Sequence, residues 1–121
     1  MTKTSTDTGD KPVVFLAVSQ PLFSLGSLVA TPGALELLAQ HGVEPAALLT
    51  RHLSGDWGQL SRDDAQANDD AVKHGDRVFS AYVLPVRATG EPEGDAASGD
   101  RVWVITEADR SSTCVLLPSE Y

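Results

Sequence analysis

The stretch WVITEADRSSTCVLLP, residues 103–118, gathers the residue types that carry chemistry. Two apolar runs flank Glu107, Asp109 and Arg110, and a row of hydroxyl residues follows. The carboxylates could act in acid–base catalysis, and Arg110 could hold a carboxylate or phosphate through two parallel hydrogen bonds. A four-residue connection between two strands also suits a type I turn, with Asp109 bonding to the backbone ahead of it. The sequence favours the turn and leaves the site open.

His52 is the second candidate for chemistry. It lies on the apolar face of a predicted helix, one turn before the phrase Gly-Asp-Trp-Gly that contains Asp56. It could be a core histidine bonded to Asp56 or to a backbone carbonyl, or a general base that Asp56 orients. A catalytic site would join His52 and Asp56 to Glu107, Asp109 and Arg110, which requires both turns to lie in one cleft.

Other kinds of site find little support. His41 and His74 each precede a glycine at a helix end, where a cation interacts well with the helix dipole. We expect no metal, because no ligand spacing such as His-Glu-x-x-His is present. Cys114 lies within an apolar strand, which is typical of an inert core thiol. We expect no cofactor, because a phosphate-binding glycine loop is also absent.

The elements that must position these residues read as an α+β fold. Helices are predicted over 31–42, 44–55 and 61–75, packed on one face of a small antiparallel sheet. The sheet ends in a three-stranded meander formed by 76–86, 101–106 and 112–118, and 12–18 and 27–30 are candidate earlier strands. Residues 1–11 read as a disordered tail, and 12–121 as one domain with a flexible loop at 87–100.

The net charge limits the kinds of partner that the protein is expected to bind. The formal net charge is -8, which argues against binding a phosphate backbone and fits a contact with a basic protein surface. Acids at 56, 63, 64, 69 and 70 form a solvated face or a negative patch that imitates nucleic acid. No apolar run is long enough to span a bilayer, so a cytoplasmic location is the expectation. A monomer and a homodimer both remain open.

Four phrases of the chain resemble a family of small bacterial proteins carried on plasmids and integrative elements. They are LVATPGALELL, LLTRHLSGDWG, DDAQANDDAVKHGDRVFSAY and VWVITEADRSSTCVLLPSEY. Some members of that family carry a label that links them to type I restriction-modification subunits. A longer 87–100 loop is the departure from the family pattern. The chain is too short for a methyltransferase domain and lacks its glycine-rich cofactor loop.

The resemblance implies a setting on mobile DNA and a candidate surface. The polar and aromatic residues of that surface are His52, Asp56, Trp57, Asp64, Asn68, Arg77, Tyr82, Glu107, Asp109 and Arg110. We expect a non-enzymatic accessory protein that binds another protein through the acidic face and the 107–111 turn, in anti-restriction, anti-CRISPR or element maintenance. The alternative is a small hydrolase or nucleic-acid-processing enzyme. In a third interpretation these residues only hold turns together, with Arg77 and Asp109 as the pair to inspect.

Overall fold

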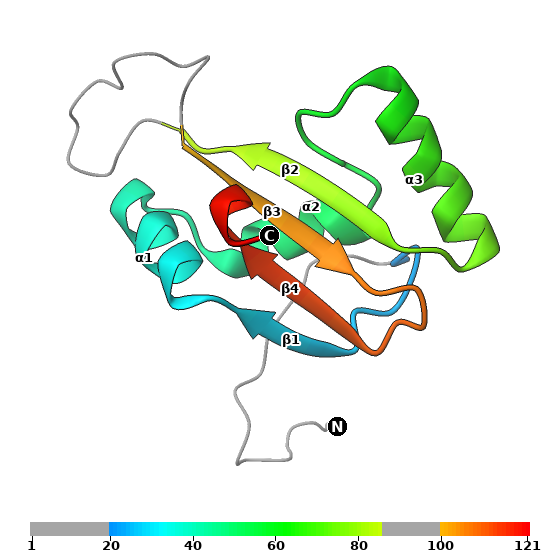
Figure 1. The fold of residues 1–121 in the computed structure, drawn as a ribbon, viewed down its shortest axis with the longest axis horizontal. Coiled ribbons are helices and arrows are strands. Elements are labelled where there is room, and N and C mark those ends of the chain that lie inside the picture. The colour runs from blue at the N-terminus through cyan, green and yellow to red at the C-terminus, as the bar shows by residue number, and fades with distance from the viewer. Residues whose placement is uncertain (1–19, 86–99) are drawn as a thin grey trace.

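The computed structural model describes residues 20–85 and 100–121. Figure 1 shows the order of elements along the chain. They are β1 (Ser27–Ala30), α1 (Pro32–His41), α2 (Pro45–Leu53), α3 (Arg62–His74), β2 (Val78–Val83), β3 (Arg101–Thr106), β4 (Ser112–Leu116) and the 3-10 helix η2 (Pro118–Glu120). The predicted α+β class and the strand at 27–30 are confirmed. The predicted tail 1–11, the strand 12–18 and nearly all of the predicted loop 87–100 lie outside the described residues.

The sheet has four strands in the order β1-β4-β3-β2. The predicted meander is confirmed, because β2 pairs antiparallel with β3 and β3 pairs antiparallel with β4. β1 runs parallel to β4, with Val29 opposite Cys114, so the sheet is mixed and not wholly antiparallel. The parallel strand requires a long crossover, and the three helices supply it.

Helices α1 and α3 begin and end at the residues that the sequence indicates, whereas α2 ends at Leu53, with Ser54 as its C-cap in place of the predicted Gly55. The Thr31 hydroxyl accepts from the Ala34 N–H at 3.1 Å, and the Ser61 hydroxyl accepts from the Asp64 N–H at 3.1 Å. Gly75 ends α3 in the left-handed region, with φ 78°. Each cap satisfies backbone groups that the helix itself leaves unpaired.

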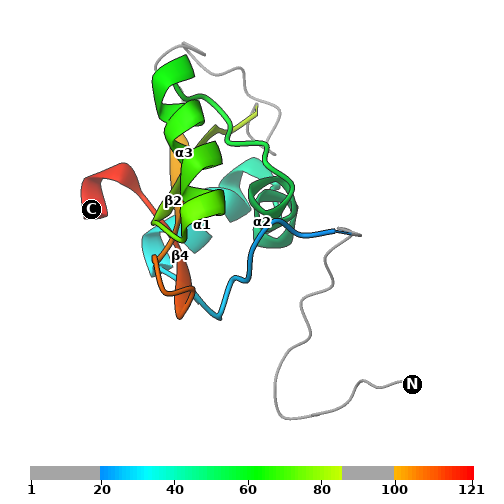
Figure 2. The same ribbon diagram turned by 90° about the vertical axis from the view of Figure 1, so that its right-hand side faces the viewer.

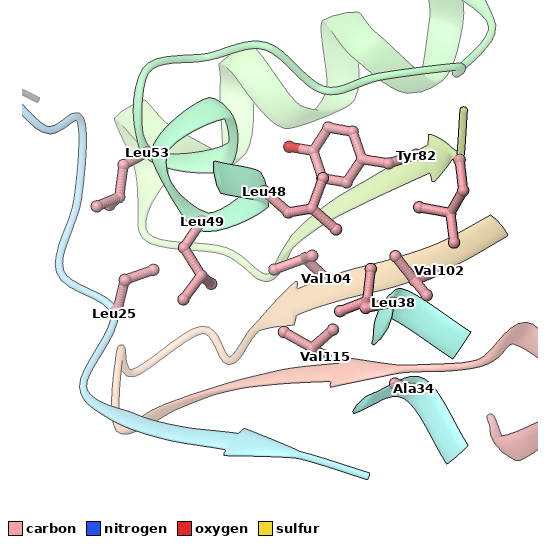
Figure 3. Close-up of a cluster of buried hydrophobic side chains, with 11 residues drawn as sticks. Leu25, Ala34, Leu38, Leu48, Leu49, Leu53, Tyr82, Val102, Val104 and Val115 are labelled. Carbon is pink, nitrogen blue, oxygen red and sulfur yellow. The ribbon is translucent and has the colours of Figure 1, made fainter. Parts of the chain in front are cut away.

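The main core lies between the sheet and helices α1 and α2. Figure 3 shows leucines of both helices, including Leu38 and Leu49, meeting Val102, Val104 and Val115 of the strands. Figure 2 shows α1 and α2 on one side of the sheet and the C-terminal segment on the other. A smaller apolar cluster of Trp57, Ala71 and Val78 joins α3 to β2.

α3 and the segment before it cover the outer edge of β2. The Asn68 side chain accepts from the Phe79 N–H at 3.0 Å and donates to the Phe79 carbonyl, as a neighbouring strand would. Ala81 N donates to Trp57 O at 3.1 Å, and Gln59 N donates to Ala81 O at 2.7 Å. The outward N–H and carbonyl groups of Phe79 and Ala81 are therefore satisfied within the chain, which protects this edge from pairing with another protein.

Candidate functional site

His52 is fully buried and belongs to a chain of hydrogen bonds through the core. Its Nδ1 lies 2.6 Å from the Ser80 hydroxyl, and its Nε2 lies 3.0 Å from the Thr106 hydroxyl. Thr106 in turn meets the Thr113 hydroxyl at 2.7 Å, and Thr113 donates to the Leu25 carbonyl at 2.8 Å. These hydrogen bonds join α2, three strands and the segment that leads into β1.

The last bond of this chain of hydrogen bonds fixes the direction of the others as far as Nε2 of His52. A carbonyl oxygen only accepts, so Thr113 donates to Leu25 and must accept from Thr106. Thr106 then accepts from His52 Nε2–H. Burial, together with the positive charge of Arg110, lowers the pKa of His52 to about 3, so the ring is neutral near pH 7 and its Nδ1 accepts from Ser80.

Aromatic rings close the outer side of His52. The Phe23 ring meets the imidazole edge-on at 5.2 Å between centroids, and the Trp57 ring does so at 5.9 Å. The Arg110 guanidinium lies over the Phe23 ring, 5.4 Å from its centroid. Ser80 and His52 have the composition of a nucleophile and its base, but both are fully buried and so face no substrate.

Asp56 does not partner His52, contrary to one expectation from the sequence. It pairs with Arg51 at 2.6 Å, and its carboxylate also accepts from the Gly58 N–H at 3.1 Å. The hydrogen bond from Arg51 is the main cause that lowers the pKa of Asp56. The Tyr82 hydroxyl donates to the Asp56 carbonyl at 2.7 Å, and burial raises the pKa of Tyr82 to about 12.

The Glu-Ala-Asp-Arg connection between β3 and β4 is a tight turn. Arg110 N donates to Glu107 O at 2.9 Å, and the Asp109 carboxylate accepts from the Ser111 N–H at 2.9 Å. Hydrogen bonds from the Ser111 side chain and backbone lower the pKa of Asp109. Arg110 has a φ of 61°, the left-handed conformation that closes such a turn.

The Arg110 guanidinium ties this turn to α3. It donates to the Ala71 carbonyl at 3.1 Å, in the last turn of α3, and to the Asp76 carbonyl at 2.6 Å. The Ala71 carbonyl also accepts from the N–H groups of Gly75 and Asp76, and a cation there interacts favourably with the C-terminal end of the helix dipole. Within residues 20–85 and 100–121, no hydrogen bond or ion pair joins Asp56 to Glu107, Asp109 or Arg110. The two turns have separate partners, and Arg110 is engaged in holding the fold.

Arg77 does not pair with Asp109 but reaches the C-terminal residue. Its guanidinium donates to the Tyr121 hydroxyl at 2.6 Å and lies over the Tyr121 ring, 5.2 Å from the centroid. Glu107 stands 3.8 Å away as a second, exposed partner. Arg77 and Glu107 thus come together at the edge of a surface hollow, although the sequence did not pair them.

That hollow lies on the face of the sheet opposite α1 and α2. Phe79, Trp103 and Ile105 alternate with the core-facing residues of β2 and β3, so they point outward. The Phe79 and Trp103 rings meet edge-on at 4.9 Å, and Trp103 meets Tyr121 at 5.6 Å. The space is about 270 Å³, and we call it the aromatic hollow; its lining residues are Arg77, Phe79, Trp103, Ile105 and Tyr121.

The acidic residues of α3 have differing surroundings. Asp63 and Asp64 are exposed in its first turn, where the helix dipole favours negative charge. Asp69 is exposed but accepts from the Trp57 indole N–H at 3.1 Å, so it also helps to hold the turn before the helix. Asp70 is exposed and accepts from Gln66.

Two further residues differ from their expected surroundings. His41 is buried, with Nδ1 2.5 Å from Pro85 O and Nε2 2.9 Å from the Asp100 carboxylate. Both ring nitrogens face oxygen atoms, and the ring joins α1 to Pro85 and Asp100. Cys114 is half-buried on the outward face of β4 and not in the core; burial raises the pKa of its thiol.

In the part of the chain that the structure describes, no three His, Cys, Asp or Glu side chains gather as metal ligands would. No helix among those residues combines the length and apolarity that crossing a bilayer requires.

The hydrogen-bond network of His52 with Ser80, Thr106 and Thr113 was not predicted from the sequence. Each of the last three is a hydroxyl residue at a core-facing position of a strand, and a valine or a tyrosine lies two positions away on the same face. That placement was a usable signal, because a buried hydroxyl needs a hydrogen-bond partner and His52 was the polar residue predicted to face the same core.

No protein-family model, no curated protein and no solved structure matches this chain.

Proposed function

We propose that this chain is a non-enzymatic module that binds another protein, and that the aromatic hollow is its contact surface. The observation that carries the proposal is the exposed aromatic and arginine cluster on the sheet face opposite α1 and α2. Tyr121 is 66% exposed, the Arg77 side chain is 46% exposed, and Trp103 is half-buried. Aromatic residues and arginine are the types enriched where protein interfaces concentrate their binding energy.

The shape of the hollow suits an apolar side chain of a partner. Buried Ile105 and the Phe79 and Trp103 rings give it an apolar lining. Arg77 supplies a positive charge to that lining, and Glu107 lies 3.8 Å from Arg77. An inserted side chain would displace water from the rings, while the two charged groups could hydrogen-bond the partner's backbone or polar side chains. A net charge of -8 favours a partner with a basic surface, because opposite charges speed encounter.

The contacts of the candidate catalytic residues support binding over catalysis. His52 is closed off by Phe23 and Trp57, and Asp56 is paired with Arg51. The enzyme alternative needs these residues to share one cleft with Glu107 and Asp109, and the contacts described above give that arrangement no support. The setting on a mobile element, with a role in anti-defence or element maintenance, rests on the resemblance of the sequence alone.

The test is affinity capture from an extract of the source cells, followed by a binding titration with the captured protein. The experimental variant is Arg77→Ala with Tyr121→Ala, two exposed residues whose loss leaves the core intact. Leu35→Ala is the matched control, because Leu35 is a 45% exposed apolar residue on α1. The proposal predicts at least about a tenfold loss of affinity for the double variant and none for the control.

Three other outcomes would contradict it. Equal binding by wild type and double variant would exclude the aromatic hollow as the contact. A loss of affinity confined to a folded double variant, Asp63→Asn with Asp64→Asn, would place the contact on the acidic side of α3. Turnover of a small substrate or nucleic acid by the pure protein would favour the enzyme alternative.

A further inference from the structure

The two edges of the sheet differ in how they are protected. The edge at β2 is covered by Asn68 and by the backbone of residues 57–59. The edge at β1 has no strand beside it within the described residues. Ser27 N donates to Ser111 O, just before β4, and Thr31 N donates to Val115 O of β4, each at 3.0 Å. In the alternation of a strand, Leu28 and Ala30 therefore direct their backbone groups outward.

The β1 edge also lacks the features that usually prevent edge pairing. Exposed edges commonly carry a lysine, a proline or a bulge. β1 has the sequence Ser-Leu-Val-Ala, its pairing to β4 is regular over all four residues, and residues 20–35 contain no charged side chain. Leu28 is 41% exposed and Val29 is 52% exposed. An open, uncharged and apolar edge in a protein of net charge -8 is well suited to pairing with another uncharged strand.

We propose that the β1 edge pairs with β1 of a second copy of this chain, antiparallel and about a two-fold axis. The outward groups permit one register that uses both residues: Leu28 opposite Ala30 of the other copy, with Val29 on the axis. In that register Leu28 and Ala30 exchange both backbone hydrogen bonds across the interface. The larger Leu28 side chain faces the smaller Ala30, and the two Val29 side chains meet on the outward face of the sheet.

The capped edge at β2 is the reason for choosing a second copy as the occupant. Pairing through β1 gives a continuous sheet in the order β2-β3-β4-β1-β1-β4-β3-β2, with both outer edges formed by β2. Those are the edges that Asn68 and residues 57–59 already satisfy. The symmetric dimer therefore leaves no strand edge open among the described residues, whereas a single copy leaves one. This inference is independent of the aromatic hollow.

The register makes a sharp prediction for disulfide trapping. Val29 would face its own counterpart at a non-hydrogen-bonded position, about 4.5 Å apart between Cα atoms, which a disulfide can span. Val29→Cys must be made together with Cys114→Ser, because Cys114 stands opposite Val29 on the neighbouring strand of the same chain. Ser27→Cys in the same background is the matched control. It is exposed on the same face, yet its copies would lie about 14 Å apart along the strands.

The expected result is rapid oxidation of the Val29→Cys variant to a covalent dimer, with little from Ser27→Cys. The wild type should sediment with about twice its 12.8 kDa mass at high concentration. Leu28→Lys should shift it toward the monomer, and Leu35→Lys on α1 should not. A wild type that stays monomeric at about 1 mM would overturn the proposal. So would equal cross-linking of the two cysteine variants, or a dimer that Leu28→Lys leaves unchanged.

Discussion

Protonation of His52 should destabilise the fold in mild acid. In the folded chain its pKa is lowered to about 3, against an ordinary value of 6.5, because the ring is buried and near Arg110. Between these two values the unfolded chain binds a proton that the folded chain refuses. The stability that comes from a neutral His52 is therefore fully present above about pH 6.5, and it is lost progressively as the pH falls toward 3.

The size of the effect follows from the two pKa values. Each pH unit inside the window costs about 1.4 kcal/mol of unfolding free energy. Since the onset near the ordinary pKa is gradual, the loss from pH 7 to pH 5 amounts to about 2 kcal/mol. The lowered pKa values of Asp56, Asp109 and Glu120 act below this range, because such carboxyl groups release stability only as the pH falls through their ordinary values near 4.

The assay is urea denaturation at pH 7, 6, 5.5 and 5, with wild type beside His52→Gln. A glutamine can accept from Ser80 and donate to Thr106, as the neutral ring does, but does not titrate. The unfolding free energy of His52→Gln is expected to be lower than that of the wild type. Its decline between pH 7 and pH 5 should be smaller than that of the wild type by about 2 kcal/mol. His74→Gln, at an exposed helix end, should keep the decline of the wild type.

If the unfolding free energies of wild type and His52→Gln fell equally between pH 7 and pH 5, this reasoning would be refuted. Equal declines would mean that His52 takes up its proton in the folded chain, and that Nδ1 donates to Ser80 and does not accept from it. A wild type that is more stable at pH 5 than at pH 7, relative to His52→Gln, would contradict it more strongly.

Two other substitutions test how the β2 edge is built, each measured by urea denaturation at pH 7. Asn68→Ala leaves the Phe79 N–H and carbonyl without their partner and should cost about 2 kcal/mol; an unchanged midpoint would contradict the strand-like role of this side chain. Gly58→Ala should cost about 3 kcal/mol or more, because a Cβ there would lie 1.9 Å from the Ala81 carbonyl oxygen. Gly75→Ala is its control: Gly75 has the same positive φ but open space, so about 1 kcal/mol is expected.

Local structure could be predicted well because its signals are local. Thr31 and Ser61 precede helices as caps, and Gly42 and Gly75 follow them, and each acts on residues within one turn. The pairing of β1 was beyond such signals. Four residues from Ser27 to Ala30 find β4 more than eighty positions later, and nothing within β1 indicates that the pairing is parallel.

The same difference between local and long-range signals holds for the candidate site. The apolar face of α2 correctly predicted that His52 is buried, but its partners Ser80 and Thr106 lie 28 and 54 positions away, and a nearer acid, Asp56, was the expected partner. The turn at Glu107–Arg110 was recognisable from its residue types. The reach of Arg110 to the Ala71 and Asp76 carbonyls depends on where α3 ends in space, and Tyr121 joins Arg77 only because η2 folds back against β3.

The most direct test of the central claim uses the two tryptophan indole N–H signals in a ¹H–¹⁵N spectrum. Trp103 lines the aromatic hollow, and Trp57 is buried with its indole bonded to Asp69, so the two report on separate places. Addition of the captured partner protein is predicted to shift or broaden the Trp103 signal and to leave the Trp57 signal in place. An unchanged Trp103 signal at saturating partner, with shifts confined to amides of α3, would contradict the account.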